Sequence, residues 1–177
     1  KTLFVLNGRY CQYRTNDTTW TVSKDFGAGK VSNDVVVHTQ NTGAGGTTLA
    51  YVAMGDSELM WKYDATSVTT TWTQHATLYA LCFAKNGRNL FRAQQTNLVT
   101  KCDVNADPWI AANWGAAAQF RVGDATSAIV KMRVHPDGTL FILKTDGIYV
   151  LLDDGTDVQL YAGTKFTPNG ANGLYSY

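Results

Sequence analysis

Residues 79–93, YALCFAKNGRNLFRA, have the pattern of two short strands joined by a tight turn. Both halves are apolar and suited to a half-buried strand, and the pair Asn86 and Gly87 supplies the positive φ angles of a type I′ hairpin turn. Residues 129–143, IVKMRVHPDGTLFIL, repeat this plan with Pro-Asp-Gly at the turn. The sequence therefore predicts the same antiparallel hairpin at two places in the chain.

The second strand of this hairpin belongs to a longer repeat. The pair Leu-Phe occurs at residues 3–4, 90–91 and 140–141, and LAYV at 49–52 fits the same frame, with spacings of 46, 41 and 50 residues. Each copy is followed about a dozen residues later by a second apolar run that ends in a polar corner. Repeats of this length, made of short strands and turns, are typical of β-propeller blades, because one small sheet cannot bury both of its faces without neighbours.

Helical periodicity is nearly absent, and the apolar runs are rich in Val, Thr, Tyr and Trp, which favour a pleated surface. We therefore predict an all-β fold, a β-propeller with about four visible blades, each a four-stranded antiparallel sheet of roughly 40–50 residues. The expected repeats of this single unit, residues 1–177, are 1–34, 35–75, 76–118 and 119–163. Residues 111–118 have helix-forming composition, but Asn113 and Gly115 limit them to one short turn.

The two ends of the chain leave two arrangements open. Residue 1 falls at the second strand of a blade, and residues 164–177 start a further blade or supply a closing strand. Either four blades close on themselves, with the C-terminal strand completing the N-terminal sheet, or the chain is a slice of a larger ring. The first residue is Lys and not Met, which favours the slice.

Each expected blade ends in an outer strand that carries aromatic residues. Trp20, Trp72 and Trp114 mark the first three, and residues 158–161 mark the last. A bulky ring at this place suits packing between adjacent blades, whereas a ring on an exposed loop could stack on a sugar. We take these three tryptophans, together with Asp124 and Asp146 near polar loops, as candidate binding residues.

Composition excludes several classes of protein. The chain has 177 residues, of which 45% are hydrophobic and 16% charged, with a formal net charge of +1. The 15 Lys and Arg residues are spread along the chain, so no basic face for nucleic acid is expected. No apolar run approaches 18 residues, which argues against a membrane span. Cys11, Cys82 and Cys102 lack a C-x-x-C spacing and are expected to be small buried strand residues, with a Cys82–Cys102 bridge as the alternative.

The sequence predicts no catalytic residue, no metal site and no cofactor. No nucleophile motif is present, and His38, His75 and His135 lie in different repeats without a local Ser or Asp partner pattern. His135 is expected in an exposed structural turn. The acidic run at residues 153–157, DDGTD, departs from the spacing of calcium-binding loops and is expected to be a solvated turn.

A propeller glycosidase would need further features. Residues 23–27, SKDFG, match the first half of the Asp-box of sialidase-like propellers, but the second half is missing. Glycoside hydrolysis also needs two carboxylates flanking one bond. The candidates lie near loops, and nothing in the sequence brings a pair of them together: Asp56, Glu58, Asp124 and Asp146.

Five segments together resemble a known group of proteins: residues 49–56 (LAYVAMGD), 90–93 (LFRA), 113–115 (NWG), 122–124 (VGD) and 144–149 (KTDGIY). Their combination resembles β-propeller proteins of tailed bacteriophages, which occur as virion or tail components. The resemblance covers nearly all of the chain. It implies a virion or extracellular location, with other virion proteins or copies of the same chain as partners, and it brings no active-site residues.

The leading hypothesis is a non-catalytic structural and binding module in a phage tail or capsid decoration. The first alternative is a lectin-like propeller that binds a surface glycan through loop aromatics. The second alternative is a propeller glycosidase or lyase.

Overall fold

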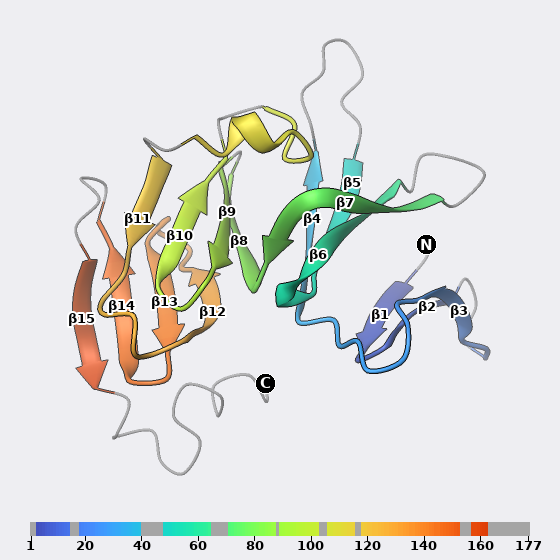
Figure 1. The fold of residues 1–177 in the computed structure, drawn as a ribbon, viewed down its shortest axis with the longest axis horizontal. Coiled ribbons are helices and arrows are strands. Elements are labelled where there is room, and N and C mark those ends of the chain that lie inside the picture. The colour runs from blue at the N-terminus through green and yellow to red at the C-terminus, as the bar shows by residue number, and fades with distance from the viewer. Residues whose placement is uncertain are drawn as a thin grey trace.

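The computed structural model describes residues 3–14, 18–39, 48–64, 71–87, 89–102, 106–115, 118–152 and 157–162. Within these ranges fifteen strands form four antiparallel sheets (Figure 1). Sheet 1 comprises β1 (Leu3–Asn7), β2 (Tyr10–Arg14) and β3 (Thr21–Asp25). Sheet 2 comprises β4 (Asp34–Thr39), β5 (Thr48–Ala53), β6 (Gly55–Asp64) and β7 (Thr71–Ala80). Sheet 3 comprises β8 (Cys82–Asn86), β9 (Asn89–Gln94), β10 (Leu98–Lys101) and β11 (Gln119–Arg121). Sheet 4 comprises β12 (Ile129–Val134), β13 (Leu140–Lys144), β14 (Gly147–Leu151) and β15 (Asp157–Ala162).

Every sheet is an up-and-down meander in which strands that follow one another in the chain are hydrogen-bonded neighbours. The first strand of sheet 3, β8, lies against the first strands of the sheets on either side, β4 and β12. First strands that gather on one side, with later strands leading outward, are the arrangement of propeller blades. The all-β, blade-like architecture is thus confirmed. The described residues do not form a closed ring, and sheets 1 and 4 lie at opposite ends of the molecule (Figure 1).

The two predicted hairpins are present, with one change. In sheet 3 the closing pair is Asn86 and Asn89, so Asn86 is the last residue of β8, and among the described turn residues the positive φ, +57°, belongs to Gly87. The first strand of this hairpin begins at Cys82 and not at Tyr79, because Tyr79 pairs with β6 as part of the long strand β7. In sheet 4 the turn places Gly138 at φ +93°.

Three of the repeated leucines, Leu49, Leu90 and Leu140, are buried in the interfaces between sheets, but not all on equivalent faces. Leu90 and Leu140 are buried on the faces of β9 and β13 that look toward the preceding sheet. Leu49 is also buried, but it faces Leu90 across the interface between sheets 2 and 3, and therefore lies on the opposite face of its own sheet. The frame of the second repeat is thus off by one residue, which reverses the face in a strand. The side chain of Leu3 lies outside the described part.

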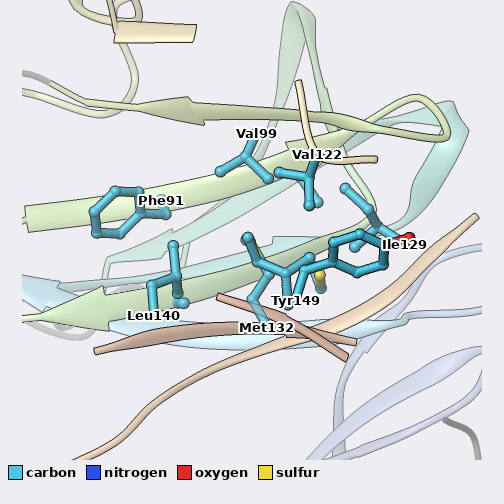
Figure 2. Packing of buried hydrophobic residues seen from close by; sticks show 11 residues of the cluster. Phe91, Val99, Val122, Ile129, Met132, Leu140 and Tyr149 are labelled. Carbon is cyan, nitrogen blue, oxygen red and sulfur yellow. The ribbon is translucent and has the colours of Figure 1, made fainter. Parts of the chain in front are cut away.

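The interface between sheets 3 and 4 holds the largest buried cluster, which Figure 2 shows around Phe91, Val99, Met132, Leu140 and Tyr149. These side chains come from five different strands of two sheets. Each buried side chain of this size contributes roughly 1.5–3 kcal/mol through the hydrophobic effect. Packing between sheets therefore stabilises the fold more than any single sheet could.

The expected outer-strand position is correct for Trp72, on β7, and wrong for Trp114. Trp114 follows a short 3-10 helix, η1 (Ala111–Asn113), in the connection between β10 and β11. Its ring is buried in the cluster between sheets 2 and 3, its Nε1 donates a hydrogen bond to the Pro108 carbonyl (2.9 Å), and the Arg92 guanidinium lies 4.6 Å from its ring centre. The helix is the single short turn that the composition of residues 111–118 predicted.

The three cysteines are buried thiols that form no disulfide, so the alternative of a Cys82–Cys102 bridge is wrong. Burial raises the pKa of Cys11 to about 11 and that of Cys82 to about 12. Both thiols are therefore protonated and unreactive at neutral pH. In the described ranges no helix is long and apolar enough to cross a membrane.

Candidate binding cleft between sheets 3 and 4

An open cavity of about 390 Å³ lies between sheets 3 and 4, beside the turns of the two predicted hairpins. We call this region the open end of the interface. Its lining combines amides, charges and aromatic rings: Asn86, Asn89, Phe91, Lys101, Phe120 and Asp137. The volume falls in the range of small-ligand and peptide sites, about 300–1,000 Å³.

The two turns beside this cleft are held together. Asn86 Nδ2, at the corner of the β8–β9 hairpin, donates a hydrogen bond to the Gly138 carbonyl at the corner of the β12–β13 hairpin (2.8 Å). The contact is close, since a Cβ atom at position 138 would lie 3.2 Å from that nitrogen. Because both corners are fixed by hairpin geometry and by each other, the wall of the cleft is preformed.

The cleft offers apolar surface and an unused acceptor. Phe91 and Leu140 are buried in its floor, and Phe120 is half-buried. The buried Oδ1 atom of Asn89 has no hydrogen-bond partner within the described part of the chain. Because a buried polar atom without a partner is costly, a ligand that donates a hydrogen bond to Asn89 would relieve that cost.

The carboxylate of the cleft is already engaged. Asp137 Oδ1 accepts a hydrogen bond from the Thr139 backbone nitrogen (2.8 Å) and lies 3.0 Å from His135 Nδ1. These contacts, first of all the hydrogen bonds from Thr139, hold the pKa of Asp137 below its usual range. His135 itself is exposed, as predicted. The pair can therefore supply negative charge and hydrogen bonds, but Asp137 is a poor proton donor at neutral pH.

The opposite end of the same interface is filled, and we call it the sealed end. Lys144 is fully buried, and its Nζ donates hydrogen bonds to the carbonyls of Val122 (2.7 Å) and Asp124 (2.6 Å). The ring of Tyr149 packs on Gly123, where a Cβ atom would lie only 2.9 Å from it. Two segments that the sequence singled out, residues 122–124 and 144–149, thus meet here as packing partners.

Two of the candidate binding residues, Asp124 and Asp146, also lie at the sealed end. Asp124 Oδ1 accepts hydrogen bonds from the nitrogen (2.8 Å) and hydroxyl (2.6 Å) of Thr126, which lower its pKa. Asp146 Oδ2 accepts a hydrogen bond from the Tyr149 hydroxyl (2.9 Å). Both carboxylates shape turns within the protein, and a binding role for them stays a prediction.

The three candidate tryptophans lie in three different places. Trp72 packs edge-on against Phe26, and its Nε1 donates a hydrogen bond to Ser23 Oγ (2.9 Å), which joins sheets 2 and 1. Trp114, in the connection between β10 and β11, is buried among side chains of sheets 2 and 3. Only the ring of Trp20, next to β3, is exposed among these three, and it lies under the Arg14 guanidinium. The structure does not bring them together.

The carboxylates considered for glycoside hydrolysis have separate partners. Asp56 accepts a hydrogen bond from the Gln95 nitrogen (2.7 Å), and burial raises its pKa. Glu58 pairs with Lys30. In the described ranges no three His, Cys, Asp or Glu side chains are grouped so that they could hold a metal ion.

His75 has a structural role in β7. Its Nδ1 accepts hydrogen bonds from the nitrogens of Thr77 (2.9 Å) and Leu78 (2.8 Å), and its Nε2 lies 2.8 Å from the Trp109 carbonyl. The ring therefore holds an irregular bend of the strand and ties it to the loop after β10. Simple strand alternation does not predict such a bend.

A partly buried ion pair between the first strands of sheets 2 and 4 was not predicted either. Asp34 Oδ1 on β4 lies 2.5 Å from Lys131 Nζ on β12, and Asp34 Oδ2 accepts a hydrogen bond from the Phe83 nitrogen on β8 (2.9 Å). One carboxylate thus links the first strands of three sheets. The one sign of this ion pair in the sequence is the acidic residue Asp34 at the start of β4.

Comparison with known proteins gives a fold and no family. No protein-family model matches the chain, and no curated protein matches it. A chain in a solved structure described as "Crystal Structure of Mitotic Checkpoint Complex" is similar over 92% of this chain and 48% of that one, with a TM-score of 0.57 and 16% sequence identity. The present chain therefore spans about half the length of its structural neighbour. At this identity the similarity concerns the fold alone, and the protein belongs to the class of propeller-like all-β proteins.

Proposed function

We propose that this chain is a non-catalytic structural and binding module that holds a protein partner in the cleft at the open end. The observation that carries the proposal is the preformed cleft itself, with its clasped hairpin corners, its apolar floor and the unpartnered acceptor of Asn89. An apolar side chain of a partner would fill the space beside Phe91 and Phe120. A backbone N–H of the same partner would satisfy Asn89.

The charges around the cleft agree with binding more than with catalysis. Acid–base catalysis works best with a group whose pKa lies near the working pH. Hydrogen bonds lower the pKa of Asp137, which keeps it ionised. Lys101 on one wall and Asp137 on the other instead offer one charge of each sign to a partner, which favours specificity.

We further propose that the module serves in a virion, as part of a phage tail or a capsid decoration. The near-neutral chain, in which Thr, Asn and Gly provide much of the polar character, suits many weak and repeated contacts. The segments that carry the phage resemblance are mostly interior, as at the sealed end. Because these segments are mostly interior, their resemblance to phage proteins supports a common fold more directly than a common binding partner.

The test is site-specific cross-linking. A photoreactive benzoylphenylalanine at position 120 is expected to attach to a virion protein when the chain is assembled into particles. The same group at Ile110, which is exposed and outside the cleft, is the matched control. Cross-linking at position 110 but not at 120 would contradict a protein partner in the cleft.

A carbohydrate is the second candidate ligand, because the cleft places two Phe rings beside amides and a carboxylate. Aromatic faces and planar hydrogen-bonding groups together suit sugars. A glycan-array signal that is lost in Phe120→Ala, with no protein cross-link at position 120, would replace the protein partner by a glycan.

A further inference from the structure

Lys101 is a charged residue on a face of sheet 3 that is otherwise apolar or uncharged in the described strands. It is the direct cross-strand neighbour of Phe91, which is buried between sheets 3 and 4, so both side chains project into that interface (Figure 2). Val99, two residues before Lys101 on β10, is buried in the same interface, as strand alternation requires. Lys101 therefore stands at a position that apolar residues fill elsewhere in this interface.

The wall of the cleft that faces Lys101 offers it no charge. Leu140 and Leu151 are directly paired across β13 and β14, and both line the cleft from the side of sheet 4. Lys101 is half-buried, and its ammonium group makes no ion pair or hydrogen bond with any described residue. The carboxylate of Asp137 is exposed and already accepts a hydrogen bond from the Thr139 nitrogen. A partly desolvated ammonium group without a counter-charge favours an anionic ligand.

The charge of Lys101 and the ring of Phe120 are set at a fixed spacing. Phe120 is the cross-strand neighbour of Val99, so Phe120 and Lys101 are diagonal neighbours on one face of sheet 3. Residues in such a diagonal pair lie about 7–8 Å apart. Alternate residues of an extended segment have nearly the same separation, about 6.5–7 Å, because a strand rises ~3.3 Å per residue. An extended partner can therefore place one side chain beside Phe120 and the next side chain of the same face beside Lys101.

We propose that the partner segment in the cleft is an extended acidic peptide, with an apolar side chain beside Phe120 and, two residues away, an Asp or Glu that pairs with Lys101. This inference rests on the proposed function and adds the chemistry of the partner. The carboxylate belongs to a side chain and not to a chain end, because a chain end is held by several free backbone N–H groups. Lys101 and the facing Leu140 instead lie in strands whose backbone groups bond to neighbouring strands. Lys101 is thus the residue that determines specificity.

Selection from a displayed library of random peptides tests this chemistry. Peptides enriched on the unaltered chain are expected to carry a large apolar residue and an Asp or Glu two positions from it. On Lys101→Glu, the same selection is expected to enrich Lys or Arg at the acidic position. Lys85→Glu is the matched control, because Lys85 is exposed on β8 of the same sheet and does not line the cleft. Peptides selected on Lys85→Glu are expected to stay acidic.

Fluorescence anisotropy then measures the charge pair itself. The probe is the most enriched acidic peptide, labelled and with an amidated C-terminus, so that a chain end cannot supply the carboxylate. Replacing its acidic residue by the matching amide, or changing Lys101→Gln in the protein, is expected to weaken binding about fivefold in each case. Both changes together are expected to cost no more than one of them, because each removes the same contact. Lys101→Arg keeps the charge and is expected to retain most of the affinity.

Cross-linking separates failure of this inference from failure of the proposed function. If the peptide attaches to benzoylphenylalanine at position 120 but binds Lys101→Gln as tightly as the unaltered chain, the cleft holds a partner and the charge pair is wrong. Enriched peptides that attach at position 120 and lack an acidic residue would overturn the inference in the same way. If no peptide is enriched, or if enriched peptides attach at position 110 and not at 120, the proposed function fails and this inference fails with it.

Discussion

The two ends of the interface between sheets 3 and 4 are built from similar strands and differ in what fills them. At the sealed end, Lys144 and Tyr149 pack on residues 122–124, and the polar atoms of this contact bond to one another. At the open end, the clasped corners of Asn86 and Gly138 border a cleft in which Asn89 keeps an unused acceptor. The comparison teaches that a distinctive motif can serve packing alone, while ordinary residues form the place where a partner can bind.

If the sealed end is tightly packed and the open end is not, the largest loss of stability is expected on substitution of Lys144. Lys144→Ala leaves the carbonyls of Val122 and Asp124 without their donor and opens a cavity, so we expect it to lower the free energy of unfolding by about 3–5 kcal/mol. Lys101→Ala at the open end is expected to change it by less than about 0.5 kcal/mol. Urea unfolding followed by tryptophan fluorescence measures both. Equal losses would mean that the two ends do not differ in this way.

Glycine substitutions are also expected to destabilise the protein more at the sealed end than at the open end. Gly123, Gly138 and Gly87 all have positive φ, so each change to Ala carries backbone strain of about 1 kcal/mol. At Gly123 the new Cβ also meets the Tyr149 ring at 2.9 Å, at Gly138 it meets the end of Asn86 at 3.2 Å, and at Gly87 it meets nothing within 4 Å. Thermal unfolding is expected to rank the losses as Gly123→Ala, then Gly138→Ala, then Gly87→Ala. A loss at Gly87 as large as that at Gly123 would contradict the packing of Tyr149.

The two ends should share one response to acid. Hydrogen bonds from Thr126 and Thr139 lower the pKa of Asp124 and Asp137 in the folded state. The unfolded chain therefore takes up protons first as pH falls, and the stability present above the ordinary pKa of about 4 is lost as pH falls through the lower folded value. Asp124→Asn and Asp137→Asn keep the turn but remove the titration. Each is expected to flatten the fall of Tm between about pH 4 and pH 2. A curve that stays parallel to that of the unaltered chain would refute the assignment.

The smallest effect is expected at His135, which is exposed at the open end. His135→Gln should change the free energy of unfolding by less than about 0.5 kcal/mol at neutral pH, as at other exposed sites. Chemical denaturation provides the measurement, with His75→Gln as the contrast, because His75 bonds to three backbone groups. A large loss at His135 would show that its contact with Asp137 supports the hairpin corner.

Much of the fold was predictable because its signals are local. Turn residues such as Gly87 and Gly138 require positive φ wherever the chain lies, and strand alternation depends only on neighbours in the sequence. The error at Leu49 shows the limit of that approach. A repeat frame tolerates a shift of one residue, but a strand does not, because each shift by one reverses the face.

The candidate site was less predictable. The sequence drew attention to Asp124 and Asp146, whose segments turned out to lie at the sealed end. The cleft depends on Asn86 meeting Gly138, and on Asn89 and Phe120 facing one space. None of these residues is unusual for a strand or a turn, so no composition or spacing marks them.

By itself the sequence determined the class of fold, the repeated sheets and the two hairpin turns, since these follow from backbone geometry and from the period of apolar residues. Only the tertiary structure decided which faces meet, which carboxylate joins three first strands, and which end of an interface stays open. Such contacts join residues many positions apart, like Asp34 and Lys131. Their free energy comes from burial and hydrogen bonding that exist only after the sheets have packed.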